Sequence, residues 1–332
     1  MSRIVLLMLS AVMLPRLTDA ADGQNTKQVV RVGMIGLDTS HVVRFTDIIN
    51  TAKSGPAVRF QVVAAYPGGS PDLPISADRI EGFTKTLREK YKVEMVDSIA
   101  ELLKRVDVVL LESVDGRPHL EQARPVIEAG KPLFIDKPIA ASLADTIEIY
   151  ELAARHKVPC FSSSSLRFKD TLHDLRGGNQ EIGQLKRCDA FGPIKPLKGH
   201  PILAFYGLHG IEMLFTVMGP GCKSVTWQKD GLIKGEWPDG RVGTFSDGKY
   251  LVKVTGSKGK TESGGGSYGP LITEICKFFD SGKAPVAAEE TINLFAFMVA
   301  AEQSRDRGHV PVSIKDVMDQ ARAEIRKRNA DR

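Results

Sequence analysis

Continuous apolar runs alternate with amphipathic stretches along the first half of the chain. Such runs are typical of strands that a parallel sheet buries on both faces, and apolar residues at every third or fourth position are typical of helices packed on it. Strands are predicted at residues 29–36, 58–66, 94–96, 108–112, 132–135 and 158–161. Helices are predicted from Val42 and at residues 75–90, 99–105, 120–130 and 143–156. This order predicts an α/β domain of the Rossmann type, with a doubly wound parallel sheet, over residues 28–168.

The pattern changes beyond residue 168, where short strands follow one another without intervening helices. They are predicted at residues 184–192, 224–229, 231–237, 241–246 and 250–256, joined by turns such as Pro238-Asp239-Gly240. Strands joined by tight turns pair antiparallel. Residues 256–269, rich in Gly and Ser, are predicted to form a mobile loop, and helices are predicted from Leu271, Ala288 and Ile314. We therefore expect an α+β domain over residues 169–332, with an open, mainly antiparallel sheet.

The first 20 residues have the composition of a secretory signal peptide. Arg3 precedes an apolar run over residues 4–14, which is too short to span a bilayer and is followed by Thr18-Asp19-Ala20. The alternative is a short membrane anchor, but nothing extends the run and no cysteine follows that could carry a lipid. We therefore predict an exported protein, periplasmic or extracellular, with no stable membrane anchor after cleavage of residues 1–20.

Composition excludes some classes of function. The chain has 332 residues, 42% of them hydrophobic and 26% charged, as in an ordinary globular protein of two domains. Its formal charge of +5 falls to +4 without the predicted signal peptide. The dense basic cluster at residues 322–332 contains no aromatic residue, so nucleic-acid binding is not predicted.

The cysteines do not predict a metal site. They are widely separated, and none belongs to a Cys-x-x-Cys pair or lies near several histidines, so neither a zinc site nor any other metal site is predicted. Whether they pair as disulfides stays open, although an apolar setting favours small buried side chains. They are Cys160, Cys188, Cys222 and Cys276.

A lysine follows the predicted strand at residues 132–135, in the triplet Asp136-Lys137-Pro138. Ligands of doubly wound sheets bind outside the carboxyl ends of the strands, where Lys137 would reach a bound molecule. The alternative is an ordinary solvated turn residue.

The turn after the first predicted strand lacks most of a dinucleotide-binding motif. Of the glycines in G-x-G-x-x-G only Gly36 is present, because Asp38 and His41 occupy the positions of the other two. Gly36, Asp38, Thr39, Ser40 and His41 are candidate phosphate contacts, at a helix start that suits anions. Equally, Asp38 or Thr39 could simply cap the helix, and Asp38 would then compete with phosphate for the same amides.

Two further loops could contact a nucleotide. The second strand ends at Tyr66 without the acidic residue that would hold a ribose, so Tyr66 could stack on a base and the choice between NAD and NADP stays open. The fourth strand is followed by a polar loop with Ser113, Asp115 and His119, just before a helix.

Together these segments resemble the glucose-fructose oxidoreductase / inositol dehydrogenase (Gfo/Idh/MocA) family over essentially the whole mature chain. The triplet at residues 136–138 resembles the family's Glu-Lys-Pro motif, and residues 113–119 resemble its nucleotide-contacting loop. Arg167-Phe168 resembles the end of its last Rossmann strand, and GLHGIE at residues 207–212 resembles its Gly-x-His-x-x-Asp segment. The resemblance implies a bound NAD or NADP, with Asp136, Lys137, Pro138 and Arg167 among its contacts.

The resemblance also implies catalytic roles, which elementary chemistry supports. His209 would take the proton of a substrate hydroxyl, and Lys137 would hydrogen-bond the same oxygen. Glu212 could orient the His209 ring or bind a substrate hydroxyl. Phe205 stands where the family commonly has an aspartate, and the neighbouring Tyr206 could substitute as a hydrogen-bonding acid.

The sequence therefore predicts an NAD(P)-dependent oxidoreductase that acts on a sugar, polyol or related hydroxylated small molecule. Because no free NAD pool is expected outside the cytosol, the cofactor would have to be tightly bound. The alternatives are an NAD-dependent glycosidase-like enzyme, and a carbohydrate-binding pseudoenzyme that has lost the dinucleotide. The sheet of the second domain could form a homo-oligomer interface, as in similar proteins.

Overall fold

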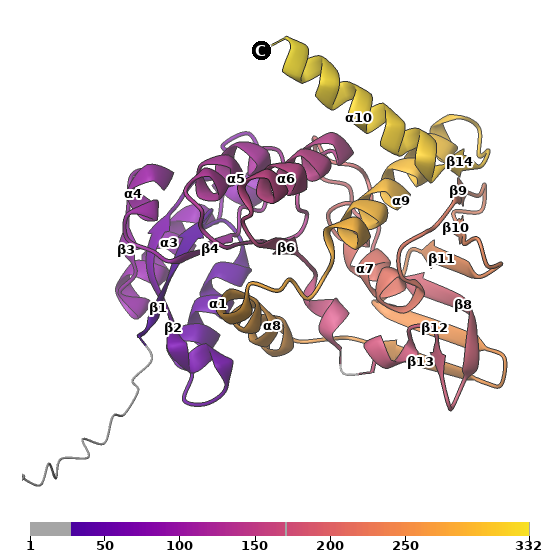
Figure 1. The fold of residues 1–332 in the computed structure, drawn as a ribbon, viewed down its shortest axis with the longest axis horizontal. Coiled ribbons are helices and arrows are strands. Elements are labelled where there is room, and N and C mark those ends of the chain that lie inside the picture. Colours follow the sequence, from indigo (N-terminus) through magenta and orange to yellow (C-terminus); the bar gives the residue numbers. More distant parts are fainter. Residues whose placement is uncertain (1–27, 170, 332) are drawn as a thin grey trace, which may run out of the picture.

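The computed structural model describes residues 28–169 and 171–331 and contains two β-sheets that lie side by side (Figure 1). The predicted signal peptide at residues 1–20 lies outside the described residues. The two sheets confirm the predicted combination of a Rossmann-type sheet and a mainly antiparallel one.

The first sheet has six parallel strands in the order β3-β2-β1-β4-β5-β6. Side chains of its central strands alternate between the faces: Val108 and Leu110 pack with Met34 in one core cluster, and Val109 and Leu111 pack in another. Both faces are therefore covered, as the continuous apolar runs predicted. The strands are β1 (Val30–Ile35), β2 (Phe60–Tyr66), β3 (Glu94–Met95), β4 (Val108–Leu111), β5 (Leu133–Ile135) and β6 (Cys160–Ser162).

Helices between these strands cover the two faces. The helices α1 and α3 pack against each other, as do α5 and α6. Apolar residues of α1 join the first core cluster, and those of α5 and α6 join the second. The helices are α1 (Ser40–Asn50), α2 (Pro74–Ala77), α3 (Ile80–Tyr91), α4 (Ile99–Leu103), α5 (His119–Glu128) and α6 (Leu143–His156), with a short 3-10 helix η1 (Pro56–Arg59).

The second sheet has the order β13-β12-β8-β11-β10-β9-β14, and β7 pairs with β8. Neighbouring strands are antiparallel except β8 and β11, which run parallel, so the prediction of antiparallel strands was wrong for that pair. The strands are β7 (Gly178–Asn179), β8 (Gly183–Phe191), β9 (Ser224–Trp227), β10 (Ile233–Glu236), β11 (Val242–Ser246), β12 (Leu251–Gly256), β13 (Lys260–Gly264) and β14 (Val312–Ser313).

Strand β13 corrects the prediction of a mobile loop over residues 256–269. It pairs with β12 along its whole length, from Leu251 opposite Gly264 to Thr255 opposite Lys260. A strand at the edge of a sheet needs few apolar side chains, because backbone hydrogen bonds to its neighbour hold it in place. The polar segment Lys260–Gly264 therefore gave no strand pattern.

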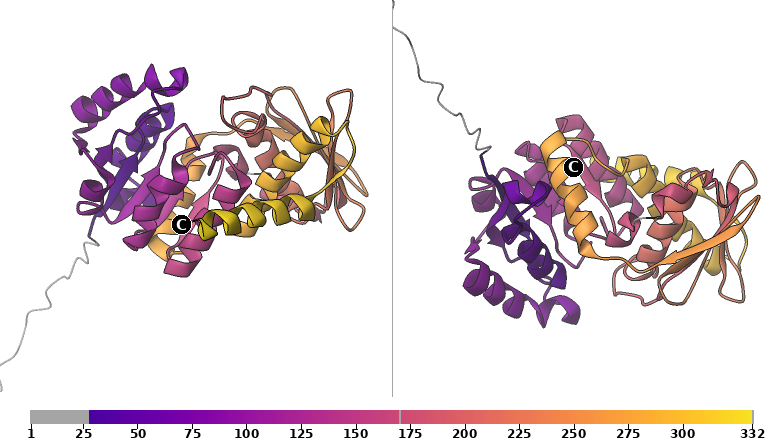
Figure 2. Two further views of the ribbon diagram at one scale, coloured as in Figure 1. Left: turned by 90° about the horizontal axis from the view of Figure 1, so that it is seen from above. Right: turned by 90° about the horizontal axis from the view of Figure 1, so that it is seen from below.

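Helices α7 (Gly207–Met218) and α9 (Ala288–Asp306) pack on the second sheet, whereas α8 (Tyr268–Ser281) crosses back to the first (Figures 1 and 2). Leu271, Ile272 and Ile275 of α8 belong to the same core cluster as Met34 and Phe45. The chain beyond residue 169 thus contributes a helix to the Rossmann-type unit. By the predicted boundary between residues 168 and 169, α8 belongs to the second domain, although its apolar side chains pack in the core of the first.

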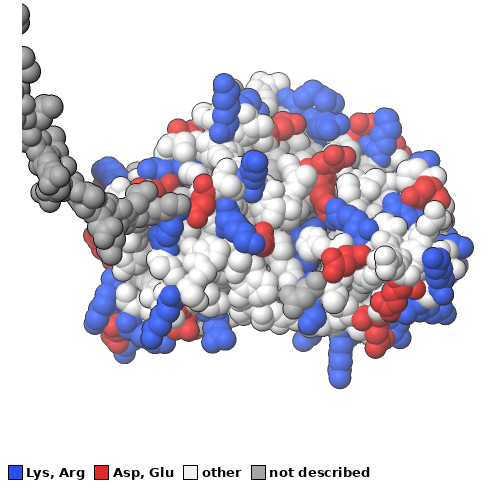
Figure 3. All heavy atoms as spheres, turned by 60° about the horizontal axis from the view of Figure 1, so that its bottom comes forward, with Lys and Arg blue, Asp and Glu red and all other residues white. Residues whose placement is uncertain are grey.

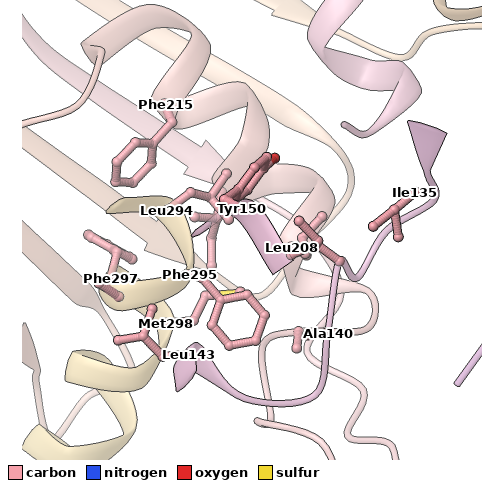
Figure 4. Close-up of a cluster of buried hydrophobic side chains, with 14 of the residues drawn as sticks. Ile135, Ala140, Leu143, Tyr150, Leu208, Phe215, Leu294, Phe295, Phe297 and Met298 are labelled. Carbon is pink, nitrogen blue, oxygen red and sulfur yellow. The ribbon is translucent and has the colours of Figure 1, made fainter. Parts of the chain in front are cut away.

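A continuous apolar core joins the two units (Figure 4). Ile135 and Leu143 from the first unit share one buried cluster with Leu208 of α7 and with Phe295 and Met298 of α9. Helix α10 (Ile314–Ala330) packs on α6 and α9 and so spans both units. This shared core holds α7 beside the ends of the parallel strands.

A buried ion-pair network reinforces this junction. Arg167 lies in the 3-10 helix η2 (Ser165–Phe168), has 1% of its surface exposed and donates to Glu212 of α7 and to Glu290 of α9. Arg176, which follows the 3-10 helix η3 (His173–Leu175), also donates to Glu290. The Arg167 cation therefore joins the end of the first unit to both helices of the second.

Surface and thiol features agree with an ordinary globular chain. On the face shown in Figure 3, lysine and arginine side chains are interspersed with acidic ones. The cysteines all lie within the described residues and form no disulfide. Burial raises the pKa of Cys160, Cys222 and Cys276 to about 12, so these thiols stay protonated at neutral pH. Within the described ranges, no helix combines the length and the apolar character needed to cross a membrane.

Replacing Arg167 by methionine is expected to lower the free energy of unfolding by about 3–5 kcal/mol, because the buried carboxylate of Glu212 loses its cation while Glu290 keeps Arg176 alone. The matched control is Arg187→Met, since Arg187 pairs with Asp189 at the surface, where an ion pair contributes about 0.2–1 kcal/mol. Urea denaturation of both variants measures the difference. Equal losses in the two variants would show that the buried network does not stabilise the junction.

Candidate active site

The candidate site lies where β1, β4 and β5 end at the carboxyl edge of the parallel sheet. In the strand order β3-β2-β1-β4-β5-β6, the chain reverses direction across the sheet between β1 and β4. Such a switch point leaves a crevice between the loops that leave the two neighbouring strands. Lys137 lies two residues after the end of β5 and reaches this edge, as the triplet predicted, and its peptide bond to Pro138 is cis.

The Lys137 ammonium lies over an aromatic ring. Its Nζ is 5.3 Å from the ring centroid of Phe205, a buried residue just before α7. No hydrogen bond to this Nζ is found among the described residues, so a ligand oxygen could take that place. Burial lowers the pKa of Lys137, and the negative charges of Asp136 and Glu112 oppose this shift.

His209, in the first turn of α7, presents one ring nitrogen to the protein. Its Nδ1 lies 2.6 Å from Oγ of Ser164, and its ring meets Tyr250 edge to face at 5.4 Å. In the tautomer whose Nδ1 donates to Ser164, Nε2 is free to accept a proton. Burial and the positive charges of Lys137 and His41 lower the pKa of His209 well below its usual value. His209 is therefore a neutral imidazole at pH 7.

The Asp38 carboxylate connects two loops and does not cap α1. It accepts hydrogen bonds from Oγ of Ser76 at 2.6 Å and from the amide of Val114 at 2.8 Å. Burial raises its pKa, and these hydrogen bonds oppose the shift. The cap of α1 is Thr39, whose Oγ1 accepts from the His41 amide. Asp38 therefore does not accept hydrogen bonds from the amides of the first helical turn. The sequence had suggested that it could compete with phosphate for these amides.

His41 and Asp136 form a buried pair at the same edge. Nδ1 of His41 lies 2.6 Å from Oδ2 of Asp136, and the imidazole ring stacks on Phe45 and meets Tyr268 edge to face. Glu112, directly after β4, is fully buried beside them, and burial together with the charge of Asp136 raises its pKa well above the usual range. The sequence analysis did not name Glu112 as a site residue. The feature that could have indicated it is a charged residue directly after an apolar strand.

Comparisons with known proteins agree with this architecture. Residues 30–164 match the model of the Gfo/Idh/MocA family, described as an oxidoreductase family with an NAD-binding Rossmann fold. The match spans β1 to β6 and ends before the second sheet, so the chain resembles this family over its Rossmann-type unit.

Individual relatives are distant in sequence. The candidate oxidoreductase YceM of Salmonella typhimurium is 29% identical over 115 residues, which span 33% of this chain and 37% of that relative. A probable dehydrogenase from Thermotoga maritima superposes with a TM-score of 0.69 at 19% identity, covering 87% of this chain and 100% of that one. Myo-inositol 2-dehydrogenase from Lactobacillus plantarum gives 0.68 at 16% identity, covering 86% and 99%. GenD2 from gentamicin A biosynthesis, solved with NAD, gives 0.69 at 14% identity, covering 91% and 99%.

The structure gives Glu212 other partners than we expected. Glu212 accepts hydrogen bonds from Ser163 and Arg167, whereas the His209 ring is held by Ser164. The buried Arg167 cation attracts the carboxylate away from the imidazole. Tyr206 has 36% of its surface exposed and meets Phe205 edge to face, and no contact of its hydroxyl with Lys137 or His209 is found among the described residues.

Several predicted cofactor contacts are enclosed by protein. Asp115 accepts from Ser70 at 2.5 Å and from Arg117, and both ring nitrogens of His119 face carbonyl oxygens, of Ser113 and Ile139. The exposed fractions are 2% for Ser113, 1% for Asp115, 0% for His119 and 1% for Arg167. These side chains therefore shape the loops from within, and Arg167 belongs to the ion-pair network and not to the crevice.

The remaining predicted contacts lie at or near the ends of β1, β2 and β5. Gly36 has φ of 83°, and a Cβ there would lie 2.5 Å from Cα of Ser113, so only glycine allows this approach of the two loops. Ser40 is exposed at the start of α1, Tyr66 is half-buried at the end of β2, and Pro138 is buried beside Lys137.

Replacing Lys137 by methionine is expected to raise the pKa of His209 towards its usual value, because a positive charge that disfavours the imidazolium is removed. NMR titration of the His209 ring in ¹³C-histidine-labelled protein measures this pKa without an activity assay. The control is Lys195→Met, which removes an exposed lysine whose charge does not act on His209. An unchanged pKa in Lys137→Met would contradict the electrostatic link.

Proposed function

We propose that this protein is an exported dehydrogenase that oxidises a secondary hydroxyl of a sugar, polyol or related molecule with a tightly held NAD or NADP. The observation that carries the proposal is the pairing of Lys137 with the neutral imidazole of His209. Among the described residues, no hydrogen bond is recorded to the Lys137 ammonium or to Nε2 of His209. Both stand at the switch-point edge of a sheet in a family of NAD-binding oxidoreductases.

The residues present fit a dinucleotide. Gly36, at φ 83°, allows the close loop approach described above, and Thr39 caps α1 while the Asp38 carboxylate is directed to Ser76 and Val114. The amino end of α1 can therefore receive phosphate oxygens, at the positive end of the helix dipole. An oxidised nicotinamide, when bound, supplies the acceptor for the hydride of the substrate.

The chain's own residues would handle the substrate oxygen and its proton. Lys137 donates a hydrogen bond to the hydroxyl oxygen and stabilises the negative charge that develops there as the proton leaves. Nε2 of His209 accepts that proton, and Nδ1 shares its hydrogen with Oγ of Ser164. The lowered pKa values of both groups keep His209 unprotonated at neutral pH and weaken the hold of Lys137 on its own proton. The pair thus suits removal of a proton from a neutral alcohol.

Substrate class and cofactor retention rest on indirect support. Myo-inositol 2-dehydrogenase and GenD2 share the fold, and the second was solved with NAD, which favours a polyhydroxylated substrate and a nicotinamide cofactor here. The signal-peptide pattern of residues 1–20 supports export of the enzyme from the cytosol. No free NAD pool is expected there, so the reduced cofactor would be reoxidised in place by a second substrate.

Purified mature protein is expected to release stoichiometric NAD or NADP when it is denatured, and mass spectrometry of the supernatant identifies it. The control is the supernatant of the same protein left folded, which should contain little nucleotide. If no nucleotide is released and added NAD and NADP do not bind, the proposal fails. A carbohydrate-binding protein without dinucleotide then becomes the better assignment.

The variants Lys137→Met and His209→Asn are expected to lower kcat/KM by about 10²–10⁴-fold, because each removes a group that acts on the hydroxyl in the transition state. Absorbance of the reduced nicotinamide, followed with inositols and hexoses as substrates, measures the rate. His309→Asn is the matched control, since His309 bonds Trp227 and asparagine tolerates its φ of 68°. Unchanged turnover in both site variants would refute the assigned roles.

A further inference from the structure

Three buried side chains from different elements converge beside Lys137. His41 lies in the first turn of α1, Glu112 follows β4 and Asp136 follows β5. One ligand-type atom from each, a ring nitrogen or a carboxylate oxygen, lies within 4.8 Å of the other two. The exposed fractions of the three residues are 9%, 0% and 3%, in that order. This cluster, the His41-Glu112-Asp136 site, is enclosed by protein.

Most of the oxygen atoms in this site have no donor. Both carboxylate oxygens of Glu112 and Oδ1 of Asp136 are buried without a hydrogen-bond partner among the described residues. The recorded side-chain hydrogen bond within the site joins Nδ1 of His41 to Oδ2 of Asp136. Buried polar atoms are almost always paired, and an unpaired carboxylate is among the most costly groups to bury. Three of the four carboxylate oxygens of the site therefore lack a donor among the described residues.

Nearby protein groups do not supply that partner. The Lys137 ammonium acts electrostatically on both carboxylates, but it lies over the Phe205 ring and donates to neither of them in the recorded hydrogen bonds. With His41 as a neutral ligand, one ammonium leaves two ionised carboxylates with a net negative charge. Nδ1 of His41 is already directed at Asp136, and no hydrogen bond from its Nε2 is recorded among the described residues.

We propose that His41, Glu112 and Asp136 bind a divalent transition-metal ion such as Zn²⁺ or Mn²⁺. One imidazole nitrogen with carboxylate oxygens suits these ions, and a divalent charge compensates both carboxylates at once. Three protein ligands leave at least one coordination position for water or another oxygen ligand. The short contact between His41 and Asp136 would open as both atoms turn to the ion.

The location of the site relates it to the crevice. Its ligands come from the loops after β1, β4 and β5, the edge at which Lys137 and His209 stand. An oxygen of a substrate or phosphate bound in the crevice could therefore complete the coordination of the ion. This inference does not depend on the proposed dehydrogenase activity, since the ion would bind whether or not a dinucleotide does. The rival explanation is a proton shared between Glu112 and Asp136.

Metal binding to the intact mature protein decides between these explanations. Elemental analysis of the purified protein, followed by calorimetric titration of chelator-treated protein with Zn²⁺, Mn²⁺ and Co²⁺, should show one ion per chain. Glu112→Gln and Asp136→Asn should each weaken binding at least about tenfold. The matched control is Glu236→Gln, which alters an exposed surface carboxylate and should bind like the parent. The visible spectrum of bound Co²⁺ should change in both site variants.

Thermal unfolding separates loss of the site from loss of the fold. Without metal, Glu112→Gln should be at least as stable as the parent, because it removes a buried charge. Added Zn²⁺ should raise the Tm of the parent and leave that of Glu112→Gln unchanged. If that variant does not fold, His41→Gln provides the same comparison. Absence of binding to the parent, or unaltered binding by the folded site variants, would overturn the proposal in favour of the shared proton.

Discussion

The buried Arg167 cation is the interaction on which the arrangement of the site depends. Arg167 ends the first unit in sequence, and its partners Glu212 and Glu290 belong to α7 and α9 of the second. Because α7 also carries His209, the same ion pair that joins the units positions the imidazole beside the end of β5. Apolar packing around α7 supplies most of the attraction, but it is not directional. The charged hydrogen bonds add the direction.

Several ionisable side chains are buried at the carboxyl edge of the parallel sheet, although the fold does not need them for stability. Glu112, Asp136, Lys137 and His41 meet where three strands end, and burying each of them opposes stability. Replacing such a cluster by apolar residues would usually cost nothing or stabilise a fold. Its presence at the edge where doubly wound sheets bind ligands is therefore better explained by chemistry than by packing, and strongly shifted pKa values are typical of functional sites.

The loop after β1 shows how a departure from a motif can keep the geometry. Asp38 replaces a glycine, yet its carboxylate bonds Ser76 and Val114 and so connects the loops after β2 and β4. Gly36 remains because the backbone of Ser113 approaches too closely for a Cβ. The crevice is thus built from loop-to-loop contacts in place of a fully glycine-lined turn. Phe205 is a second departure, because its ring lies beneath the Lys137 ammonium at the position where the Gfo/Idh/MocA family commonly has an aspartate.

The sequence by itself determined the doubly wound sheet, the second sheet and the positions of Lys137 and His209 at element ends, because hydrophobic periodicity and turn residues act locally. Only the tertiary structure decided which helices, strands and charged side chains contact one another. Periodicity reports which face of α8 is buried but not that it returns to the first sheet, and it cannot show that β8 and β11 run parallel. Likewise Glu212 shares a helix with His209 yet bonds Arg167, and Glu112 meets Asp136 from another strand. The attraction between charged groups depends on their distance in space and on their burial. Neither quantity can be calculated from their separation along the chain.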